Sequence, residues 1–355
     1  MQHERFHYRT LDELKEKAKE LEIQLPLAKD TKILMTPYTF GCVTLPNRVG
    51  IAPMEGADGL PDGSPSELTV NRYVREAEGG SGMIWFEAIS IVPEGRSSLH
   101  QLMLTRDNLD AYKKMTEAVK EAGRKANGFA PYLVMQANHS GRYSNPQGKP
   151  APMIAYRHPE YEKLRKADDS CIVSDDYLKS LEEKFGEAAW LAREAGFDAV
   201  DIKSCHGYLL AELSSAYIRP GMYGGSFENR IKYPMDVLKT VIDEVNGEVP
   251  VQIRVSVDEY VDDGMKFEEV KTVCHVAKEM GVASISLSAG CYDAVEYAIQ
   301  PMFIPQGFIT PFAKELKAEI DIPVIVAARL NDAHLIENVV ENDEADIVAI
   351  GRGLI

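Results

Sequence analysis

The sequence predicts an α/β protein and, within that class, a (β/α)8 TIM barrel. Eight short apolar runs rich in β-branched residues recur along the chain, and most are followed by a loop and an amphipathic helical segment. Strands buried on both faces form continuous apolar runs, and strand–helix alternation implies parallel strands joined by right-handed crossovers. The 355 residues could hold two average domains, but eight strands favour one barrel over a doubly wound open sheet.

The first part of the chain is predicted to be a helical arm, residues 1–36, and the barrel is predicted to occupy residues 37–355. Thr10 is a suitable N-cap for a helix whose apolar residues Leu11, Leu14 and Ala18 follow at helical spacing. Pro26 should end that helix, because proline cannot continue it. The arm should pack outside the barrel.

The eight apolar runs give the predicted strands. In chain order they are Val49–Met54, Met83–Ala88, Tyr132–Gln136, Ala199–Lys203, Val251–Ser256, Ser284–Ser288, Val324–Ala328 and Ile347–Gly351. The predicted helices between them are Glu67–Glu78, Asn108–Asn127, Ser174–Ala195, Asn229–Val245, Lys266–Met280, Pro311–Glu319 and Asn331–Glu341. Ser174 as an N-cap, and Gly196 and Gly281 after helix ends, agree with these bounds. The sequence ends right after the eighth strand, so a final helix is absent from it, and the arm or a partner subunit could cover that strand.

Composition and charge exclude several classes of function. The formal charge of -16 argues against a nucleic-acid partner, because affinity for phosphate backbones comes from clustered Lys and Arg. The sequence has no run of roughly 18 apolar residues and no signal-peptide core, which predicts a cytoplasmic protein with no membrane partner. Five widely spaced cysteines without a C-x-x-C pair predict neither a disulfide framework nor a metal site. The expected partner is a small molecule, and a homo-oligomer is one arrangement we consider.

Polar residues gather where the predicted strands end. In a barrel the carboxyl ends of the strands share one mouth, where the chemistry is found. These polar or glycine features are Glu55-Gly56, Glu87, Gln136, Lys203 with His206 and Tyr208, Arg254, Arg329, and Gly351-Arg352-Gly353. Loops after strands seven and eight commonly build a phosphate site, so the ligand should carry a phosphate. Neither a P-loop nor a dinucleotide fingerprint is present.

Successive segments resemble the motifs of the Old Yellow Enzyme family of NAD(P)H:flavin oxidoreductases. They are "NRVGIAPM", "EAISIVPEGR", "QANHSGR", "HGYLLAELSSAYIRPGMYGGSFENR", "IRVS", "IPVIVAARLND" and "ADIVAIGRGL", in the family's order from about Pro37 to Ile355. "ARLND" and the "SAGCYD" loop are most similar to the longer branch, the 2,4-dienoyl-CoA reductase-like enzymes. The resemblance implies FMN on a TIM barrel, with NADH or NADPH as the hydride donor.

The resemblance also assigns roles to residues by position. Gln136 and Arg254 would contact the pyrimidine side of the flavin. The residues that would line the ring or hold the phosphate are Pro53, Met54, Glu55, Ala88, Ala328, Arg329, Gly351 and Arg352. His206 would bind the substrate oxygen, and Tyr208 would donate a proton. Two residues depart from the family: Glu55 stands where Thr or Cys is common, and Lys203 where His or a neutral residue is usual.

The implied reaction is an ene-reduction, in which a double bond conjugated to a carbonyl, as in a steroid-like enone or an enoyl thioester, receives hydride and a proton. This belongs to the oxidoreductases acting on CH–CH groups. His206 and Lys203 would stabilise the growing enolate, which is worth about 3 kcal/mol for one well-placed donor. Tyr208 is protonated at neutral pH and suits proton delivery.

The sequence also leaves open other functions for the protein and purely structural roles for several of these residues. A flavin enzyme that oxidises or demethylates amines, or cleaves C–N or C–O bonds, is one alternative, and a non-catalytic barrel subunit is another. Lys203 could be an exposed strand-end lysine, while Cys205 should pack in the barrel wall because adjacent strand residues face opposite sides. His139 could line the pocket or support a loop, and Arg142 should buttress that loop. Arg254 inside a strand needs an anionic or hydrogen-bonding partner, which a ligand would supply.

Overall fold

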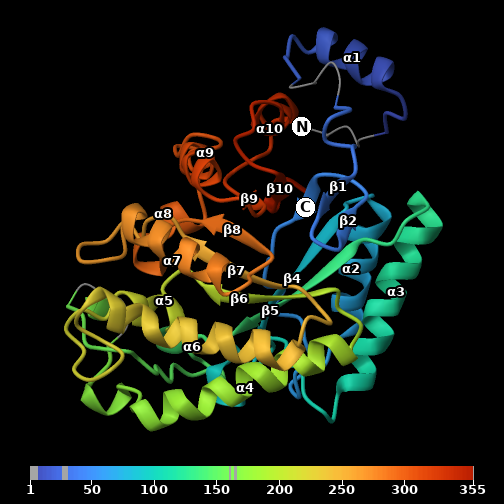
Figure 1. Ribbon diagram of the computed structural model, residues 1–355. Helices are drawn as coiled ribbons and strands as arrows, with labels where there is room; N and C mark the ends of the chain where they lie inside the picture. Colours follow the sequence, from blue (N-terminus) through green and yellow to red (C-terminus); the bar gives the residue numbers. More distant parts are fainter. Residues whose placement is uncertain (1–6, 26–30, 160, 164–165, 355) are drawn as a thin grey trace.

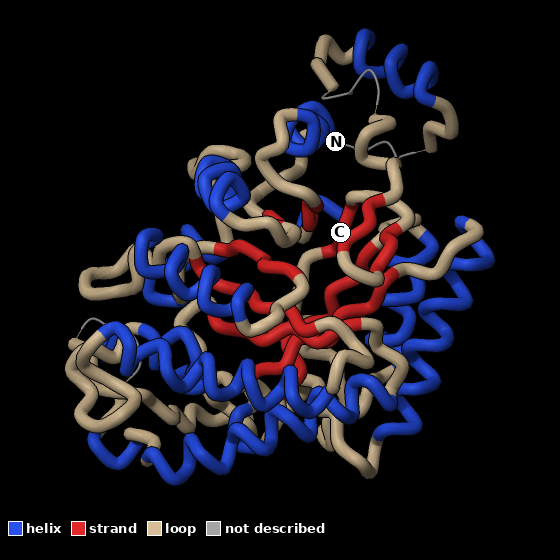
Figure 2. Tube along the Cα trace, in the orientation of Figure 1, coloured by secondary structure: helices blue, strands red, loops and turns tan. Residues whose placement is uncertain are grey.

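Eight parallel strands close into a barrel in the computed structural model, which describes residues 7–25, 31–159, 161–163 and 166–354. Around the barrel the strand order is β10, β3, β4, β5, β6, β7, β8, β9, so β10 closes onto β3. Helices surround the strands (Figure 1), and the tube view separates the central strands from the outer helices (Figure 2). The predicted (β/α)8 barrel is confirmed.

The observed elements follow the predicted order. The barrel strands are β3 (Val49–Ile51), β4 (Met83–Ser90), β5 (Tyr132–Asn138), β6 (Ala199–Ser204), β7 (Val251–Ser256), β8 (Ser284–Ser288), β9 (Val324–Val326) and β10 (Ile347–Ile350). The helices between them are α2 (Glu67–Glu78), α3 (Leu109–Asn127), α4 (Asp175–Glu194), α6 (Phe227–Val245), α7 (Phe267–Glu279), α9 (Thr310–Glu319) and α10 (Ala333–Glu341). Ser174 caps α4 by accepting from the Tyr177 N–H, as predicted. Gly196 and Gly281 have the positive φ angles of helix-ending glycines.

Strand ends are where the sequence prediction was wrong. Strand β3 stops at Ile51 instead of Met54, β9 at Val326 instead of Ala328, and β10 at Ile350 instead of Gly351. The apolar runs continue there, but the backbone leaves the sheet to enter the loops of the mouth. Strands β4 and β5 run two residues further than predicted, because Ser90 and Asn138 still pair in the ladder although both are polar. Apolarity therefore marks burial, not the extent of pairing.

A two-stranded hairpin that the sequence did not predict closes the amino-terminal end of the barrel. Strands β1 (Tyr38–Phe40) and β2 (Val43–Leu45) pair antiparallel, and each has only three residues. Phe40 and Leu45 of the hairpin pack with Trp85 and Ile347, which belong to the barrel strands. The barrel interior is thus filled with apolar side chains at this end, which leaves the other end for the polar residues.

Two short helices, α5 (Leu209–Ser214) and α8 (Val295–Ala298), lie in the loops after β6 and β8 and were also not predicted. The last described element is a 3-10 turn at Arg352–Leu354, so the described chain has no α-helix after β10. None of the helices in the described part of the chain combines the length and apolarity needed to cross a membrane.

The predicted arm contains one helix, α1 (Leu11–Glu20), which Thr10 caps by accepting from the Glu13 N–H. Only Ala18 of this helix is buried, and Figure 1 shows α1 (dark blue) standing away from the barrel. Pro26, the predicted stop, lies outside the described residues. The division of the chain at residues 36 and 37 stays a prediction.

Candidate active site

The barrel interior changes from apolar to polar toward the carboxyl ends of the strands. Paired residues of parallel strands point to the same side of a sheet, so the ladder places a set of polar side chains together. Gln136 pairs with Asp201, Lys203 pairs with Arg254, and Arg254 pairs with Ser286. The apolar residues that alternate with them along the strands pack against the outer helices. Strand alternation therefore places predicted residues from three strand ends, Gln136, Lys203 and Arg254, on the inner face of the barrel.

Gln136 is bonded to a carboxylate that the sequence analysis did not single out. Its Nε2 donates to Asp201 Oδ2 at 2.6 Å, and both side chains are buried. Burial raises the pKa of Asp201 to about 6, against the opposing effects of the Gln136 hydrogen bond and the Arg254 charge. The hydrogen bond fixes the orientation of the Gln136 amide.

Arg254 is the clearest sign of a ligand. Its side chain is buried, and Nη2 donates to Ser288 Oγ at 3.3 Å. Its Nε and Nη1 are also buried, and neither has a hydrogen-bond partner among the described residues. Buried polar groups are normally satisfied, because each unsatisfied one costs about 1–3 kcal/mol, more when it is charged. The two nitrogens are therefore placed for acceptor atoms that a bound molecule would bring.

His206 adopts an unusual backbone conformation after β6. Its φ of 63° is in the left-handed region, which is uncommon for a residue other than glycine and often marks functional sites. The ring Nε2 lies 2.7 Å from Ser288 Oγ, so Ser288 contacts both His206 and Arg254. Burial lowers the pKa of His206 well below its usual range, and the charges of Arg254 and Lys203 lower it further. The imidazole is neutral at pH 7.

Tyr208 lies in a cluster of protic groups with Glu55, Lys203 and Tyr292. The Tyr208 hydroxyl donates to Glu55 Oε1 at 3.3 Å and lies 3.1 Å from the Tyr292 hydroxyl. Lys203 Nζ lies 3.8 Å from the centre of the Tyr208 ring and 3.9 Å from Glu55 Oε1. Lys203 is not an exposed lysine, since only 7% of its side chain is accessible. The sequence did not predict the hydrogen bond between Tyr208 and Glu55.

The electrostatics of this cluster keep Tyr208 protonated. Burial raises the pKa of Tyr208 well above its usual range, and the neighbouring Glu55 raises it further. Burial lowers the pKa of Lys203, while Glu55 acts in the opposite direction. Glu55 therefore favours the protonated forms of both neighbours, in keeping with the ordinary effect of a nearby negative charge.

Two tyrosines that the sequence analysis did not select complete the wall of the mouth. Tyr143 follows β5 and Tyr292 follows β8, and their rings lie 5.7 Å from the Tyr208 ring in edge-to-face arrangements. The Tyr143 hydroxyl donates to Asp293 Oδ2 at 2.8 Å. Tyr143 directly follows the matched motif "QANHSGR" and Tyr292 lies within the "SAGCYD" loop, but tyrosine by itself carries no signal because most tyrosines in barrels pack.

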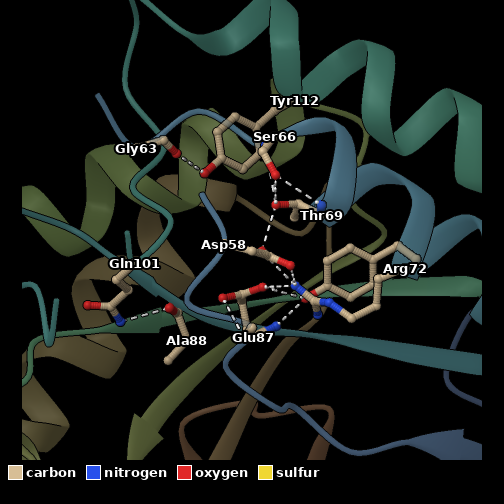
Figure 3. A network of polar contacts seen from close by, with 11 residues as sticks. Asp58, Gly63, Ser66, Thr69, Arg72, Glu87, Ala88, Gln101 and Tyr112 are labelled. Carbon is tan, nitrogen blue, oxygen red and sulfur yellow. Dashed lines mark hydrogen bonds and ion pairs between the residues drawn. The ribbon is translucent and has the colours of Figure 1, made fainter. Parts of the chain in front are cut away.

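An ion-pair network around the buried Glu87 supports the loop that carries Glu55, and Figure 3 shows Glu87 with its partners Arg72 and Asp58. Arg72 Nη2 donates to Glu87 Oε1 at 2.6 Å and to Asp58 Oδ1 at 3.1 Å. Glu87 Oε2 accepts the Gly56 N–H at 3.2 Å, next to Glu55. A Cβ on Gly56 would lie 2.3 Å from Arg72 Nη2, so a larger residue there would have to displace the guanidinium from its ion pairs. Glu87, predicted at the mouth without a role, thus anchors the β3 loop.

The predicted phosphate residues follow β9 and β10, which are neighbouring strands of the barrel. Arg329, with a φ of 49°, donates through Nη1 to the Ile304 carbonyl, and Arg352 Nη2 donates to the Gln300 carbonyl at 2.6 Å. Both acceptors lie in the segment 299–307, which is also bonded to the Ala328 carbonyl. These carbonyls are neutral, so the bonds leave the charge of the two guanidinium groups for an anion.

The residues predicted to line a flavin ring fall at the same end. A Cβ added at Gly351 would lie 3.4 Å from Met54 Sδ, so these two residues are in close contact. Pro53 precedes Met54 and is half-buried. Ala88 pairs with Gln136, and its carbonyl accepts from Gln101 Nε2 at 2.8 Å (Figure 3).

Arg142, His139 and Cys205 have the supporting positions that the sequence suggested. Arg142 pairs with Glu212 at 2.5 Å in a buried ion pair and also donates to the Tyr156 carbonyl, so it buttresses the loop after β5. His139 accepts the Gly141 N–H and lies 3.0 Å from the Tyr177 hydroxyl, which assigns it to loop support. Cys205 is fully buried. Across the described ranges, no group of three or more His, Cys, Asp or Glu side chains could hold a metal ion.

This arrangement fits the flavin implied by the resemblance. The unsatisfied Arg254 nitrogens and the Gln136 amide suit the hydrogen-bonding edge of a planar ring. The guanidinium groups of Arg329 and Arg352 keep their positive charge for an anion such as a phosphate. The protic cluster around Tyr208 is where a substrate could receive a proton.

Comparisons with known proteins identify the family of the chain. Residues 33–355 match the model of the NADH:flavin oxidoreductase / NADH oxidase family. The NADPH dehydrogenase of Bacillus subtilis (strain 168) is 30% identical over 328 residues, with 91% of each chain covered. The NADH oxidase of Thermoanaerobacter brockii is 30% identical over 334 residues, which are 91% of this chain and 49% of that protein.

Two solved structures show the same fold. A 2-naphthoyl-CoA reductase complex with 2-naphthoyl-CoA has a TM-score of 0.81 at 20% identity, covering 91% of this chain and 50% of the other. Morphinone reductase in complex with tetrahydroNAD has a TM-score of 0.71 at 22% identity, covering 90% and 86%. The chain thus spans about half the length of some relatives and most of the length of others.

Proposed function

The chain belongs to the NADH:flavin oxidoreductase / NADH oxidase family, and we propose that it is an ene-reductase that saturates a C=C bond conjugated to a carbonyl. The resemblance to the Old Yellow Enzyme family is confirmed. FMN is the cofactor, and NADH or NADPH is the hydride donor. The observation that carries the proposal is the buried, protonated Tyr208 hydroxyl beside Lys203 and near His206 at one mouth of the barrel.

FMN, when bound, supplies the hydride that it has accepted from the nicotinamide. In our proposal Gln136 and Arg254 bind its pyrimidine edge, while Pro53, Met54 and Ala88 lie against the ring. The phosphate would be held by residues that follow two strands: Ala328 and Arg329 after β9, and Gly351 and Arg352 after β10. The unsatisfied nitrogens of Arg254 support this assignment.

The chain's own residues would handle the oxygen and the proton of the substrate. His206 is neutral and can donate an N–H to the carbonyl oxygen, and Lys203 adds positive charge where the enolate grows. Such preorganised donors stabilise developing negative charge in a water-poor site. Tyr208 then delivers its hydroxyl proton to the α-carbon, since it holds that proton at neutral pH. The expected subclass is oxidation–reduction of CH–CH groups.

Amine oxidation is the second candidate, because histamine dehydrogenase from Rhizobium sp. 4-9 has the same fold, with a TM-score of 0.75 at 21% identity. One observation disfavours it. The position over the Tyr208 ring and beside Glu55, where a substrate ammonium would be attracted, is already occupied by the Lys203 ammonium. A cationic substrate would be repelled there, whereas a neutral enone or an acyl thioester would not.

The test is anaerobic reduction of the purified holoenzyme with NADH or NADPH, followed by mixing with a panel of cyclic enones and enoyl thioesters. The wild type should be reoxidised by a conjugated acceptor. Tyr208→Phe should still accept hydride from the nicotinamide but turn over the acceptor at least about 100-fold more slowly. Tyr217→Phe is the matched control, because Tyr217 also donates to a carboxylate, Asp263 at 2.7 Å, but at the surface.

Three outcomes separate the candidates. Equal turnover by Tyr208→Phe and Tyr217→Phe would remove the proton-donor role. Bleaching of the flavin by an amine, without any nicotinamide, would favour the amine oxidase. Failure of every conjugated acceptor to reoxidise the reduced wild type would reject ene-reduction altogether.

A further inference from the structure

We propose that Glu55 is a proton relay that returns a proton to the Tyr208 hydroxyl after each turnover. It acts through Tyr208 and is therefore a positioning residue that does not itself contact the substrate. The inference rests on the proposed function, because it assumes that Tyr208 loses its proton to a substrate.

The Glu55 carboxylate connects the buried phenol to the outside of the protein. Its Oε1 accepts from the Tyr208 hydroxyl at 3.3 Å and lies 3.9 Å from Lys203 Nζ. Its Oε2 accepts from Ser97 Oγ at 2.9 Å. Tyr208 is 1% exposed, whereas 27% of the Glu55 side chain is exposed. A proton can therefore reach Glu55 from water, and from Glu55 it has one hydrogen bond to cross.

The carboxylate is held in place from two sides. On its own loop, Gly56 is tied to the buried Glu87. On the facing loop, the Ser97 N–H donates to Gln101 Oε1 at 2.6 Å, and the neighbouring Arg96 donates to the Leu99 and Gln101 carbonyls. Two anchored loops thus aim one carboxylate at the Tyr208 hydroxyl, as a relay requires.

The proton transfers need no reactant other than the substrate and water. The Tyr208 O–H bond breaks, the proton forms the new C–H bond at the substrate α-carbon, and a tyrosinate remains. Glu55 takes a proton from water and passes it along the existing hydrogen bond, which restores the phenol and the carboxylate. During the step, two adjacent negative groups face the Lys203 ammonium, which lowers the cost of their proximity.

Tyr292 offers a competing route, because its hydroxyl lies 3.1 Å from that of Tyr208 and 37% of the residue is exposed. A phenol is a poorer relay than a carboxyl group at neutral pH, because its reference pKa is about 10 and that of Glu is about 4.3. The two routes are distinguished by single substitutions.

The experiment uses the holoenzyme and separates the first turnover from later ones. Glu55→Gln keeps the shape of the side chain but cannot carry a proton. Prereduced Glu55→Gln should complete its first turnover with an enone, because Tyr208 begins protonated, and later turnovers should slow about 100-fold. Asp263→Asn is the control, since Asp263 accepts from Tyr217 at the surface, and it should show no such slowing.

Chemical rescue adds a result that a merely structural role would not produce. In Glu55→Ala, added formate should restore the later turnovers, and the restored rate should depend on pH as formic acid titrates. Tyr208→Phe should not respond to formate. No rescue of Glu55→Ala, or later turnovers in Glu55→Gln as fast as in Asp263→Asn, would overturn the proposal. Slowing in Tyr292→Phe but not in Glu55→Gln would assign the relay to Tyr292 instead.

A measurement without turnover tests the coupling itself. With 13C-labelled tyrosine, the NMR signal of Tyr208, assigned with Tyr208→Phe, should titrate at a lower pH in Glu55→Gln than in the wild type, because the carboxylate raises the pKa of Tyr208. An unchanged titration would contradict the relay. If the wild type reduces no enone, the proposed function fails, and this titration still shows whether the Glu55–Tyr208 pair exists.

Discussion

Replacing Arg254 with methionine should weaken FMN binding without destabilising the flavin-free protein. Two of the Arg254 nitrogens are buried without a hydrogen-bond partner in the described part of the chain, and each costs about 1–3 kcal/mol in the absence of a ligand. Methionine removes that cost. It also removes the 3.3 Å bond to Ser288 and the attraction to Asp201, together about 1–3 kcal/mol. The gain of about 2–6 kcal/mol is larger than the loss of about 1–3 kcal/mol over most of these ranges, so the flavin-free protein should lose at most about 1 kcal/mol of unfolding free energy.

The holoprotein should respond differently. Two charge-assisted hydrogen bonds to FMN are worth about 3–6 kcal/mol, which corresponds to a 100- to 10,000-fold rise in Kd. The assay is fluorescence titration of flavin-free protein with FMN, alongside chemical denaturation with and without FMN. Gln252→Met is a suitable control, because Gln252 is also buried on the same strand and its amide atoms find no hydrogen-bond partner among the described residues. A flavin-free Arg254→Met protein destabilised by several kcal/mol, with FMN affinity unchanged, would refute the reasoning and make Arg254 a structural residue.

Three further predictions concern the β3 loop and a buried carboxyl group, Glu259. Arg72→Met should lower the free energy of unfolding by about 3–5 kcal/mol in denaturant titrations, because it leaves Glu87 buried and uncompensated, and adding Glu87→Gln should recover part of the loss. Gly56→Ala should destabilise the same loop, visible as faster amide exchange there, since its Cβ would meet Arg72. Burial raises the pKa of Glu259 to about 7, so the stability that it contributes is full below about pH 4.5 and is lost as pH rises to 7, a change of about 3 kcal/mol. Stability curves at pH 5 and pH 8 should therefore converge in Glu259→Gln, and equal pH dependence in the variant and the wild type would contradict this.

The barrel could be predicted because burial leaves a direct mark on a sequence. Parallel strands covered on both faces must be apolar throughout, and the polar exceptions at their ends, Gln136 and Arg254, stood out against that background. Their position on the inner face of the barrel followed from the alternation of side chains along the strands. The hairpin β1–β2 escaped detection because three-residue strands are too short to show alternation.

The contacts of the mouth could not be predicted, because they depend on loop conformations. Glu55 accepts from Tyr208 from the β3 loop, and that loop is bonded through Gly56 to Glu87 on another strand. No feature of the sequence indicated a role for residues 299–307. Two backbone carbonyls of this segment nevertheless accept hydrogen bonds from Arg329 and Arg352, the arginines predicted to bind the phosphate. Loop geometry of this kind is set by tertiary packing and not by local preference.

The most direct test of the proposed reaction is the position of deuterium in the product. Reduction of a cyclic enone with nicotinamide deuterated at the transferred position, in ordinary water, should place one deuterium on the β-carbon and none on the α-carbon. The converse experiment, with unlabelled nicotinamide in heavy water, should label the α-carbon. A saturated product with the nicotinamide deuterium on the α-carbon, or no saturated product at all, would contradict the account.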